Sequence, residues 1–310
     1  FLKFFYPKND ILYNKSNTWF FTIYPANWTN KSLDRQLLDL PNKDNSYYLF
    51  YYLNYPKDIH VNKKIHLKKF KEIQKKIKDR YVFVESYLNF FDIVKCYYSS
   101  IAQLIKLHKL KYSKEFTKNF SFKNNLDLSD VFFDELSSSY YELIPYAKLN
   151  GISVKNFFKN FKKKQTYVSY AEMYSEHRAA YYFLKKGKIK HTTIALQHAI
   201  LTKNYSSCNL RKKEFYNKKF NSDLLCPSPD YYFTSNYAHD RNLSKFLPKN
   251  KLHNIGLIRN EKIKKKIISL KTKNKFIILI PFSQYDFKFF INELEKLELK
   301  KKYLIIFTLH

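Results

Sequence analysis

Short apolar runs alternate with longer amphipathic segments in the middle of the chain, which is the pattern of strands separated by helices. Residues 167–170 (Tyr-Val-Ser-Tyr) predict a strand, and the helical segment after it carries Glu172 and ends at Gly187. Residues 191–196 predict a second strand, which ends at Gln197 and His198. Together these segments predict a βαβ unit. In open α/β sheets the carboxyl ends of the strands line the crevice where ligands bind, so the unit also indicates a site.

The same alternation extends to both sides of this unit, although the first sixty residues are aromatic-rich and only weakly periodic. Asn150 and Gly151 are expected to end a helix that begins near Asp130. Strands separated by helices predict a parallel α/β sheet with right-handed crossovers. Further strands are predicted at 47–53, 81–84, 231–234, 252–257, 276–280 and 303–307. Further helices are predicted at 62–80, from the end of the 81–84 strand to about Lys109, around 154–161, and at 238–246 and 286–299.

These elements predict two lobes. Residues 1–262 are expected to form an N-terminal α/β lobe, and residues 270–310 the start of a second Rossmann-like lobe. A lysine-rich helix or linker, 261–275, joins them. One βαβ unit is too small to be a domain, so we expect the chain to be a fragment in which the second lobe is cut short.

The chain is strongly basic, with 57 Lys and Arg against 26 acidic residues and a formal net charge of +31. Such a charge suits nucleic acid, an anionic membrane surface or a phosphorylated substrate. Only 3 glycines accompany abundant Lys, Asn, Ile, Phe and Tyr, however, and we favour AT-rich coding bias as the main cause. The segment 62–80 predicts a basic amphipathic helix. It can lie on an anionic membrane, but a surface helix with its apolar stripe toward the core is the preferred interpretation.

Motif spacing excludes several classes of function. The chain has no glycine-rich phosphate loop, no GxGxxG, HExxH or GxSxG motif, and no aromatic–basic signature of an RNA-binding sheet. Cys96, Cys208 and Cys226 lack the spacing of a zinc site and indicate buried or idle thiols in a reducing cytoplasm. No apolar stretch reaches the roughly 18 residues that a membrane span requires.

Ionisable residues follow the two central strands, and each has a structural alternative. His198, with Gln197 beside it, can hold a phosphate or sugar hydroxyl or move a proton near neutral pH, but it can equally cap the next element. Glu172 can accept a proton from an attacking hydroxyl, although acidic residues also favour helix N-termini through the helix dipole. Glu176 lies one turn further on, roughly 5–6 Å from Glu172 on the same helix face.

Anion-binding groups are predicted close to other strand ends. Arg178 and Arg259 can each fork onto phosphate oxygens, or lie on a solvated charged face. Ser283 follows the apolar strand of the second lobe, where main-chain N–H groups can receive phosphate, but a serine that caps a helix has the same sequence. His310 ends the last predicted strand.

Four motifs in order along the chain resemble one family: Glu172 before a helix, the strand end Gln197-His198-Ala199, the strand start Pro229-Asp230-Tyr231, and the strand exit from Gly256 to Arg259. They are similar to the bacterial surface-carbohydrate (capsule, lipopolysaccharide) biosynthesis glycosyltransferases of GT-B type. In that family the strand after the helix ends in Gln-His-Gly and the exit resembles Gly-Asn-Pro-Arg, whereas Ala199 and Ile258 stand at two of these positions here. The resemblance covers roughly residues 167–310.

The resemblance implies a GT-B fold, a sugar nucleotide donor and a lipid-linked or glycan acceptor, without a metal or other cofactor. The cationic surface fits work at the inner membrane face. It implies Glu172 as the catalytic base, Gln197 and His198 as residues of the catalytic cleft, Arg259 as phosphate-facing and His310 as a donor-site residue. The fragment alone is expected to be inactive, because most of the donor lobe is absent.

Two alternatives stay open. One is a related transferase that moves glycerol phosphate or another polyol phosphate from a CDP-linked donor. The other is a non-enzymatic basic module that binds a membrane or nucleic acid, with nucleic acid the less favoured partner.

Overall fold

The computed structural model divides the chain into two units, Phe1–Arg259 and Asn260–His310, each described by itself below. The structure describes residues 15, 17–24, 28, 37, 45–52, 63–78, 80–122, 126–171, 175–197, 227–235, 237–245, 247–256, 276–282 and 303–309.

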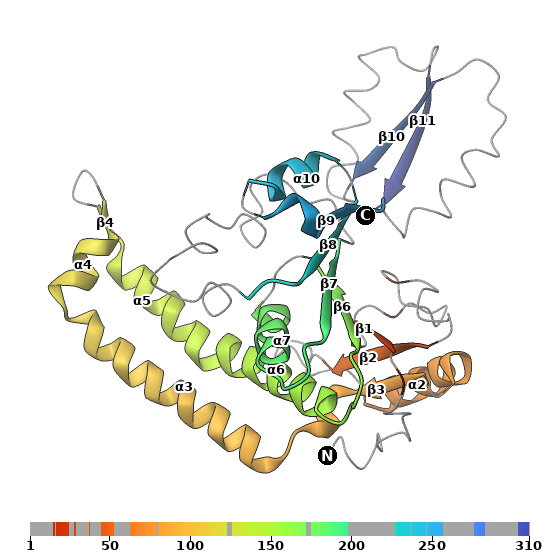
Figure 1. Ribbon diagram of the computed structural model, residues 1–310. Helices are drawn as coiled ribbons and strands as arrows, with labels where there is room; N and C mark the ends of the chain where they lie inside the picture. Colours follow the sequence, from red (N-terminus) through yellow and green to blue (C-terminus); the bar gives the residue numbers. More distant parts are fainter. Residues whose placement is uncertain are drawn as a thin grey trace. The chain divides into compact units, whose positions relative to one another are not determined.

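The first unit is built on a sheet of seven parallel strands (Figure 1). The order across the sheet is β3-β2-β1-β6-β7-β8-β9, so chain order reverses between β1 and β6. This is the strand order of doubly wound Rossmann-like sheets. The strands are β1 Thr18–Tyr24, β2 Ser46–Tyr52, β3 Tyr81–Phe83, β6 Thr166–Tyr170, β7 Thr192–Leu196, β8 Tyr231–Thr234 and β9 Leu252–Asn254.

The predicted parallel α/β sheet is confirmed, and six of these seven strands coincide with predicted ones. The exception is β1, which the weak periodicity of the first sixty residues does not predict. A signal was present, because Asn17 precedes this apolar run and Pro25 follows it. Because the neighbouring segments are also rich in aromatic residues, this apolar run is not distinct in the sequence.

In the chain, the helices of the first unit come between these strands. The α-helices are α2 Lys63–Ile77, α3 Phe90–Lys111, α4 Lys114–Phe120, α5 Ser129–Ser138, α6 Ile144–Phe158, α7 Ser175–Lys185 and α10 Tyr237–Leu243. Shorter turns are the 3₁₀ helices η3 Val84–Tyr87 and η5 Lys249–Lys251 and the π-helical η4 Ser139–Leu143.

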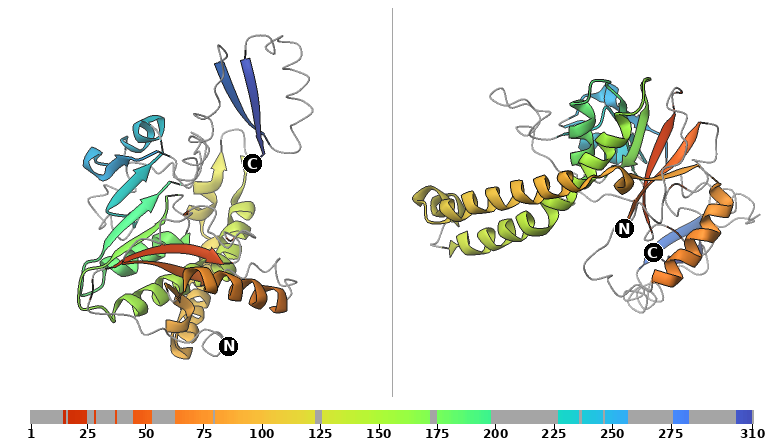
Figure 2. Two further views of the ribbon diagram at one scale, coloured as in Figure 1. Left: turned by 90° about the vertical axis from the view of Figure 1, so that its right-hand side faces the viewer. Right: turned by 90° about the horizontal axis from the view of Figure 1, so that it is seen from below.

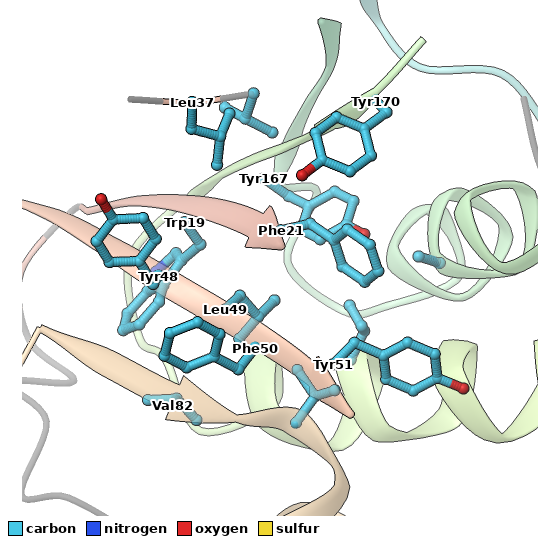
Figure 3. Close-up of a cluster of buried hydrophobic side chains, with 14 of the residues drawn as sticks. Trp19, Phe21, Leu37, Tyr48, Leu49, Phe50, Tyr51, Val82, Tyr167 and Tyr170 are labelled. Carbon is cyan, nitrogen blue, oxygen red and sulfur yellow. The ribbon is translucent and has the colours of Figure 1, made fainter. Parts of the chain in front are cut away.

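Helices cover both faces of the sheet. Adjacent residues of a strand point to opposite faces. On β2, Tyr51 meets Tyr146 of α6 with ring centroids 5.4 Å apart, whereas its neighbour Phe50 meets Phe70 of α2 at 6.0 Å. Aromatic and aliphatic side chains from β1, β2, β3 and β6 form the core between the sheet and these helices (Figure 3). The predicted helix at 62–80 therefore turns its apolar stripe toward the core, as preferred.

The prediction that Asn150 and Gly151 end a helix is wrong. The helical path runs from α5 through η4 into α6 and ends only at Phe158. Gly151 is buried where α6 packs on α7, and a Cβ added there would lie 2.5 Å from Cδ2 of Phe183. The glycine serves close helix packing, which the sequence pattern does not distinguish from a helix stop.

Helix α3 and the α5–η4–α6 helix form an antiparallel hairpin between β3 and β6, which we call the arm (Figure 2, right). A second, smaller core of Leu104, Leu107 and Phe133 holds the two sides of the arm together. Helix α4 and the two short strands β4 Ser121–Phe122 and β5 Leu126–Asp127 connect them. The helix expected to begin near Asp130 starts after this connection, as α5 at Ser129.

The second unit contains two parallel strands, β10 Phe276–Phe282 and β11 Tyr303–Leu309, paired in register from Phe276 with Tyr303 to Phe282 with Leu309. Both strands were predicted. The helix predicted at 286–299 lies outside the described residues.

The amino ends of the central strands are joined by Gln165, which is buried just before β6. Its Oε1 accepts hydrogen bonds from the backbone N–H of Asn17 (3.0 Å) and from Nε1 of Trp19 (3.1 Å). Its Nε2 donates to the carbonyls of Lys15 (2.8 Å) and Lys163 (2.9 Å). One amide therefore connects the start of β1 to the start of β6.

His191 extends this network and predicts a pH dependence of stability. Its Nδ1 accepts the N–H of Gln165 at 3.1 Å, which requires an unprotonated nitrogen. Burial, with a smaller contribution from Lys164, lowers the pKa of His191 from 6.5 to about 4. Between these values the unfolded chain binds a proton that the folded chain does not, so stability falls as pH falls from 6.5 toward 4.

We expect His191 to account for a loss of about 1 kcal/mol in unfolding free energy between pH 7 and pH 5, allowing for its partial exposure. Urea unfolding of the wild type and of His191→Asn at the two pH values measures it. The variant should lose less stability on acidification than the wild type does. Equal losses would show that His191 does not titrate in this way.

Candidate functional site

The strand order places the candidate site at the carboxyl edge of the sheet, between β1 and β6. Ligands of open α/β sheets bind where the strand order reverses, outside the carboxyl ends of the strands. After β6 the chain passes Ala171 and enters α7 at Ser175. Glu172 follows Ala171 directly in sequence but lies outside the described residues.

Glu176 is a buried carboxyl in the first turn of α7, at this same edge. Its side chain is 9% exposed, and Ser175 donates a hydrogen bond from Oγ to Oε2 at 3.2 Å. Burial raises the pKa of Glu176, while hydrogen bonds from its own backbone N–H and from Ser175 oppose the rise. Asn150 of α6 donates to its backbone carbonyl at 3.1 Å, which ties the start of α7 to α6.

Tyrosines surround the same point on the α6 and α7 face of the sheet. Burial raises the pKa of Tyr51 well above its usual value, with further contributions from Tyr146, Glu85 and Glu176. The hydroxyl of Tyr51, on β2, donates to the backbone carbonyl of Tyr146 at 3.4 Å. These groups come from β2, η3, α6 and α7, so they form one polar cluster inside the carboxyl edge.

A second pair of hydroxyls extends the cluster along β6. Oγ of Ser169 and the hydroxyl of Tyr181 lie 2.5 Å apart. Burial also raises the pKa of Tyr167, with smaller effects of Tyr181 and Glu176. A buried carboxyl with a raised pKa, at the carboxyl edge of a parallel sheet, marks a candidate functional site. The sequence singled out only Glu176 of this cluster, because the tyrosines belong to segments far apart in the chain.

His177, between Glu176 and Arg178, is fully buried and does not belong to a solvated charged face. Its ring meets Phe21 edge-on at 4.8 Å and Tyr170 at 5.8 Å, which anchors α7 on β1 and β6. Arg178, the next residue, is half-buried in the first turn of α7. It therefore lies at the carboxyl edge, where the sequence places a phosphate-binding group.

Gln197 lies at the same edge, one strand further along. The register pairs Tyr170 with Leu196, and Ala171 donates its N–H to the carbonyl of Leu196 at 3.0 Å. Gln197 is buried, and its Oε1 accepts the N–H of Ser235 at 2.8 Å. This amide holds the turn after β8 against the end of β7, so Gln197 has a clear positioning role at the edge.

Asp230 lies at the opposite, amino edge of the sheet. Its Oδ2 accepts hydrogen bonds from the backbone N–H of Thr193 (2.8 Å) and from Oγ1 of Thr193 (3.0 Å), which aligns the starts of β7 and β8. The motif Pro229-Asp230-Tyr231 therefore has a structural role, away from the carboxyl edge.

The remaining candidates lie outside the described residues: His198, Arg259, Ser283 and His310, together with Glu172. Of the seven candidates, the structure thus places Arg178 and Gln197, both at the carboxyl ends of neighbouring strands. Within the described part of the chain, no cluster of three or more His, Cys, Asp or Glu side chains is placed to hold a metal ion.

Comparison with known proteins identifies no matching protein-family model, no similar curated protein and no similar solved structure. Among the residues that the structure describes, no helix combines the length and the apolar character needed to cross a bilayer.

Proposed function

We propose that the chain belongs to a glycosyltransferase of GT-B type, which transfers a sugar from a sugar nucleotide to a lipid-linked or glycan acceptor of the cell surface. The observation that carries the proposal is the strand order of the first unit. The strand order reverses between β1 and β6, and the carboxyl end of β6 therefore borders the crevice where ligands of such sheets bind. Glu172, which the family resemblance names as the base, comes soon after β6 in the chain.

The proposed chemistry needs one proton acceptor and a set of anion-binding groups. Glu172 takes the proton of the acceptor hydroxyl as its oxygen bonds to the anomeric carbon. The bond from that carbon to the donor phosphate breaks, and the leaving nucleotide keeps the electron pair. Arg178 and Arg259 stabilise phosphate charge, and His198 binds beside Gln197. Ser283 and His310 are assigned to the donor nucleotide, and no metal or other cofactor takes part.

The buried cluster around Glu176 supports the proposed site because it holds the start of α7 in place. Because Glu176 lies in the first turn of α7 and is hydrogen-bonded to Asn150 and Ser175, it fixes the start of the helix that comes after Glu172 in the chain. Burial raises the pKa of Glu176, which lies at the same edge of the sheet as the proposed crevice. We place the enzyme at the cytoplasmic face of the inner membrane, where such acceptors are assembled.

Transfer assays on the natural protein test the proposal, with a panel of sugar nucleotides and with CDP-glycerol. We expect turnover with a sugar nucleotide, and a loss of about 10²- to 10⁴-fold in kcat for Glu172→Gln because the proton acceptor is gone. His198→Ala should also reduce turnover. Glu72→Gln, at an exposed position on α2, is the matched control and should retain full activity.

Three outcomes separate the alternatives. Turnover with CDP-glycerol alone would favour the polyol phosphate transferase. Full activity of both the Glu172 and the His198 variants would overturn the site assignment. Absence of turnover and of sugar-nucleotide binding across the whole panel would overturn the proposed function.

A further inference from the structure

Helix α3 of the arm has apolar side chains on two faces. One face carries Cys96, Ser100, Leu104 and Leu107, which are buried toward α5 and α6. A helix at a protein surface normally presents polar residues on the face away from its core. Here that face is apolar as well, and packing among the residues of the first unit that the structure describes does not account for it.

The exposed face of α3 forms a continuous stripe, which we call the α3 stripe. Its residues recur three, four or seven positions apart and so share one side of the helix. Exposure reaches 73% at Phe90, 74% at Tyr98 and 85% at Tyr112, just past the helix end. The full set is Phe90, Val94, Tyr98, Ile101, Ile105 and Tyr112. Contiguous exposed apolar surface of this kind marks an interaction site.

Charge separates the two sides of the arm. The segment 90–120, which holds α3 and α4, has six lysines and two acidic residues. The facing segment 126–143 has five acidic residues and no lysine. Lys95, Lys106 and Lys109 are exposed on α3 itself. The α3 side of the arm therefore combines apolar side chains with positive charge.

We propose that the α3 stripe docks on an anionic lipid bilayer. Phenylalanine and tyrosine side chains suit the boundary between headgroups and acyl chains, and lysines beside them attract anionic headgroups. A second copy of this chain is a poorer occupant, because pairing α3 with α3 brings lysines of like charge together and coiled-coil seams are mainly aliphatic. Docking would hold the protein at a lipid surface without a membrane span.

The inference is independent of catalysis, although it fits the proposed function. Binding to vesicles is therefore measured without any donor, on the natural protein, by co-sedimentation with phosphatidylcholine vesicles that contain or lack about one-third phosphatidylglycerol. We expect binding to the anionic vesicles only. Replacing Tyr98, Ile101 and Ile105 together by serine should weaken it at least 10-fold. Replacing Lys95, Lys106 and Lys109 by glutamine should weaken it about 100-fold at low salt.

The matched control removes the same number of lysines from a different part of the protein. Lys71 and Lys75 are exposed on α2 and Lys78 just past its end, and replacing the three by glutamine should leave vesicle binding within about threefold of wild type, since they are not on the arm. Equal losses in the α2 and α3 lysine variants would mean attraction by net charge alone and would overturn the proposal.

Folding and self-association are checked on the same samples. Circular dichroism and thermal unfolding should be unchanged by substitutions at these exposed positions. If the serine variant binds vesicles like the wild type but converts a dimer to a monomer in light scattering, the α3 stripe binds a second copy and the proposal fails. If neither the wild type nor the serine variant binds anionic vesicles, the proposal also fails.

Discussion

Gly151→Ala should lower the free energy of unfolding by about 2–4 kcal/mol, even though alanine is intrinsically the better helix former by about 1 kcal/mol. The added Cβ would lie 2.5 Å from Cδ2 of Phe183 and 2.9 Å from the carbonyl oxygen of Ala179. The second contact is with backbone, so α7 must move away from α6. Urea unfolding followed by circular dichroism measures the change.

Two further variants make the prediction specific. Phe183→Ala in the Gly151→Ala background should recover part of the loss relative to the sum of the single changes, because it removes the ring contact but leaves the contact with Ala179. Gly187→Ala is the matched control. A Cβ at Gly187 meets backbone oxygens only at 3.2 and 3.4 Å, so the loss should be smaller. A gain in stability from Gly151→Ala would contradict this packing of α6 on α7.

Gln165→Leu should cost about 3 kcal/mol of unfolding free energy. Leucine has nearly the same size, but it leaves the N–H of Asn17 and Nε1 of Trp19 without their acceptor. A buried polar group left without its partner costs about 1–3 kcal/mol, so two such donors account for most of the loss. Chemical denaturation at pH 7 measures it, with Trp19 fluorescence reporting on the same junction.

Asn160→Ala provides the comparison for Gln165. Asn160 is exposed, and its Nδ2 donates to the carbonyls of Asn156 and Phe157, both at 3.1 Å. Because water can replace these bonds, the change should stay within about 0.5 kcal/mol. Similar losses for the two variants would show that the amide of Gln165 does not join β1 to β6 as described.

Much of the sheet could be predicted because its strands are short apolar runs bounded by turn residues, as at β7 and β8. Gly151 was misread because a glycine that permits helix contact and one that ends a helix look alike in sequence. The arm was missed as a unit because its exposed apolar residues fit the same helical period as a buried face. Strand order, which locates the crevice, depends on pairings such as Thr18 with Thr166 that no local pattern encodes.

The candidate site divides in the same way. Position after a strand was sufficient to place Arg178 and Gln197 at the carboxyl edge. Asp230 entered only through the strand-start motif of the family resemblance, and it lies before β8, where it aligns the amino ends of β7 and β8. Glu85 and Tyr146 approach Tyr51 only through the packing of η3 and α6 on β2, so their contribution to the cluster follows from the fold alone.

Hydrogen–deuterium exchange of the natural protein, with and without a saturating sugar nucleotide, tests most directly whether the ligand binds at the carboxyl ends of β1 and β6. We expect added protection in peptides that cover residues 171–178 and 197–203, and unchanged exchange in peptides 190–193 and 227–231 at the far ends of the strands. Protection confined to the latter peptides, or none in either set while the nucleotide is bound, would contradict the assignment of the site.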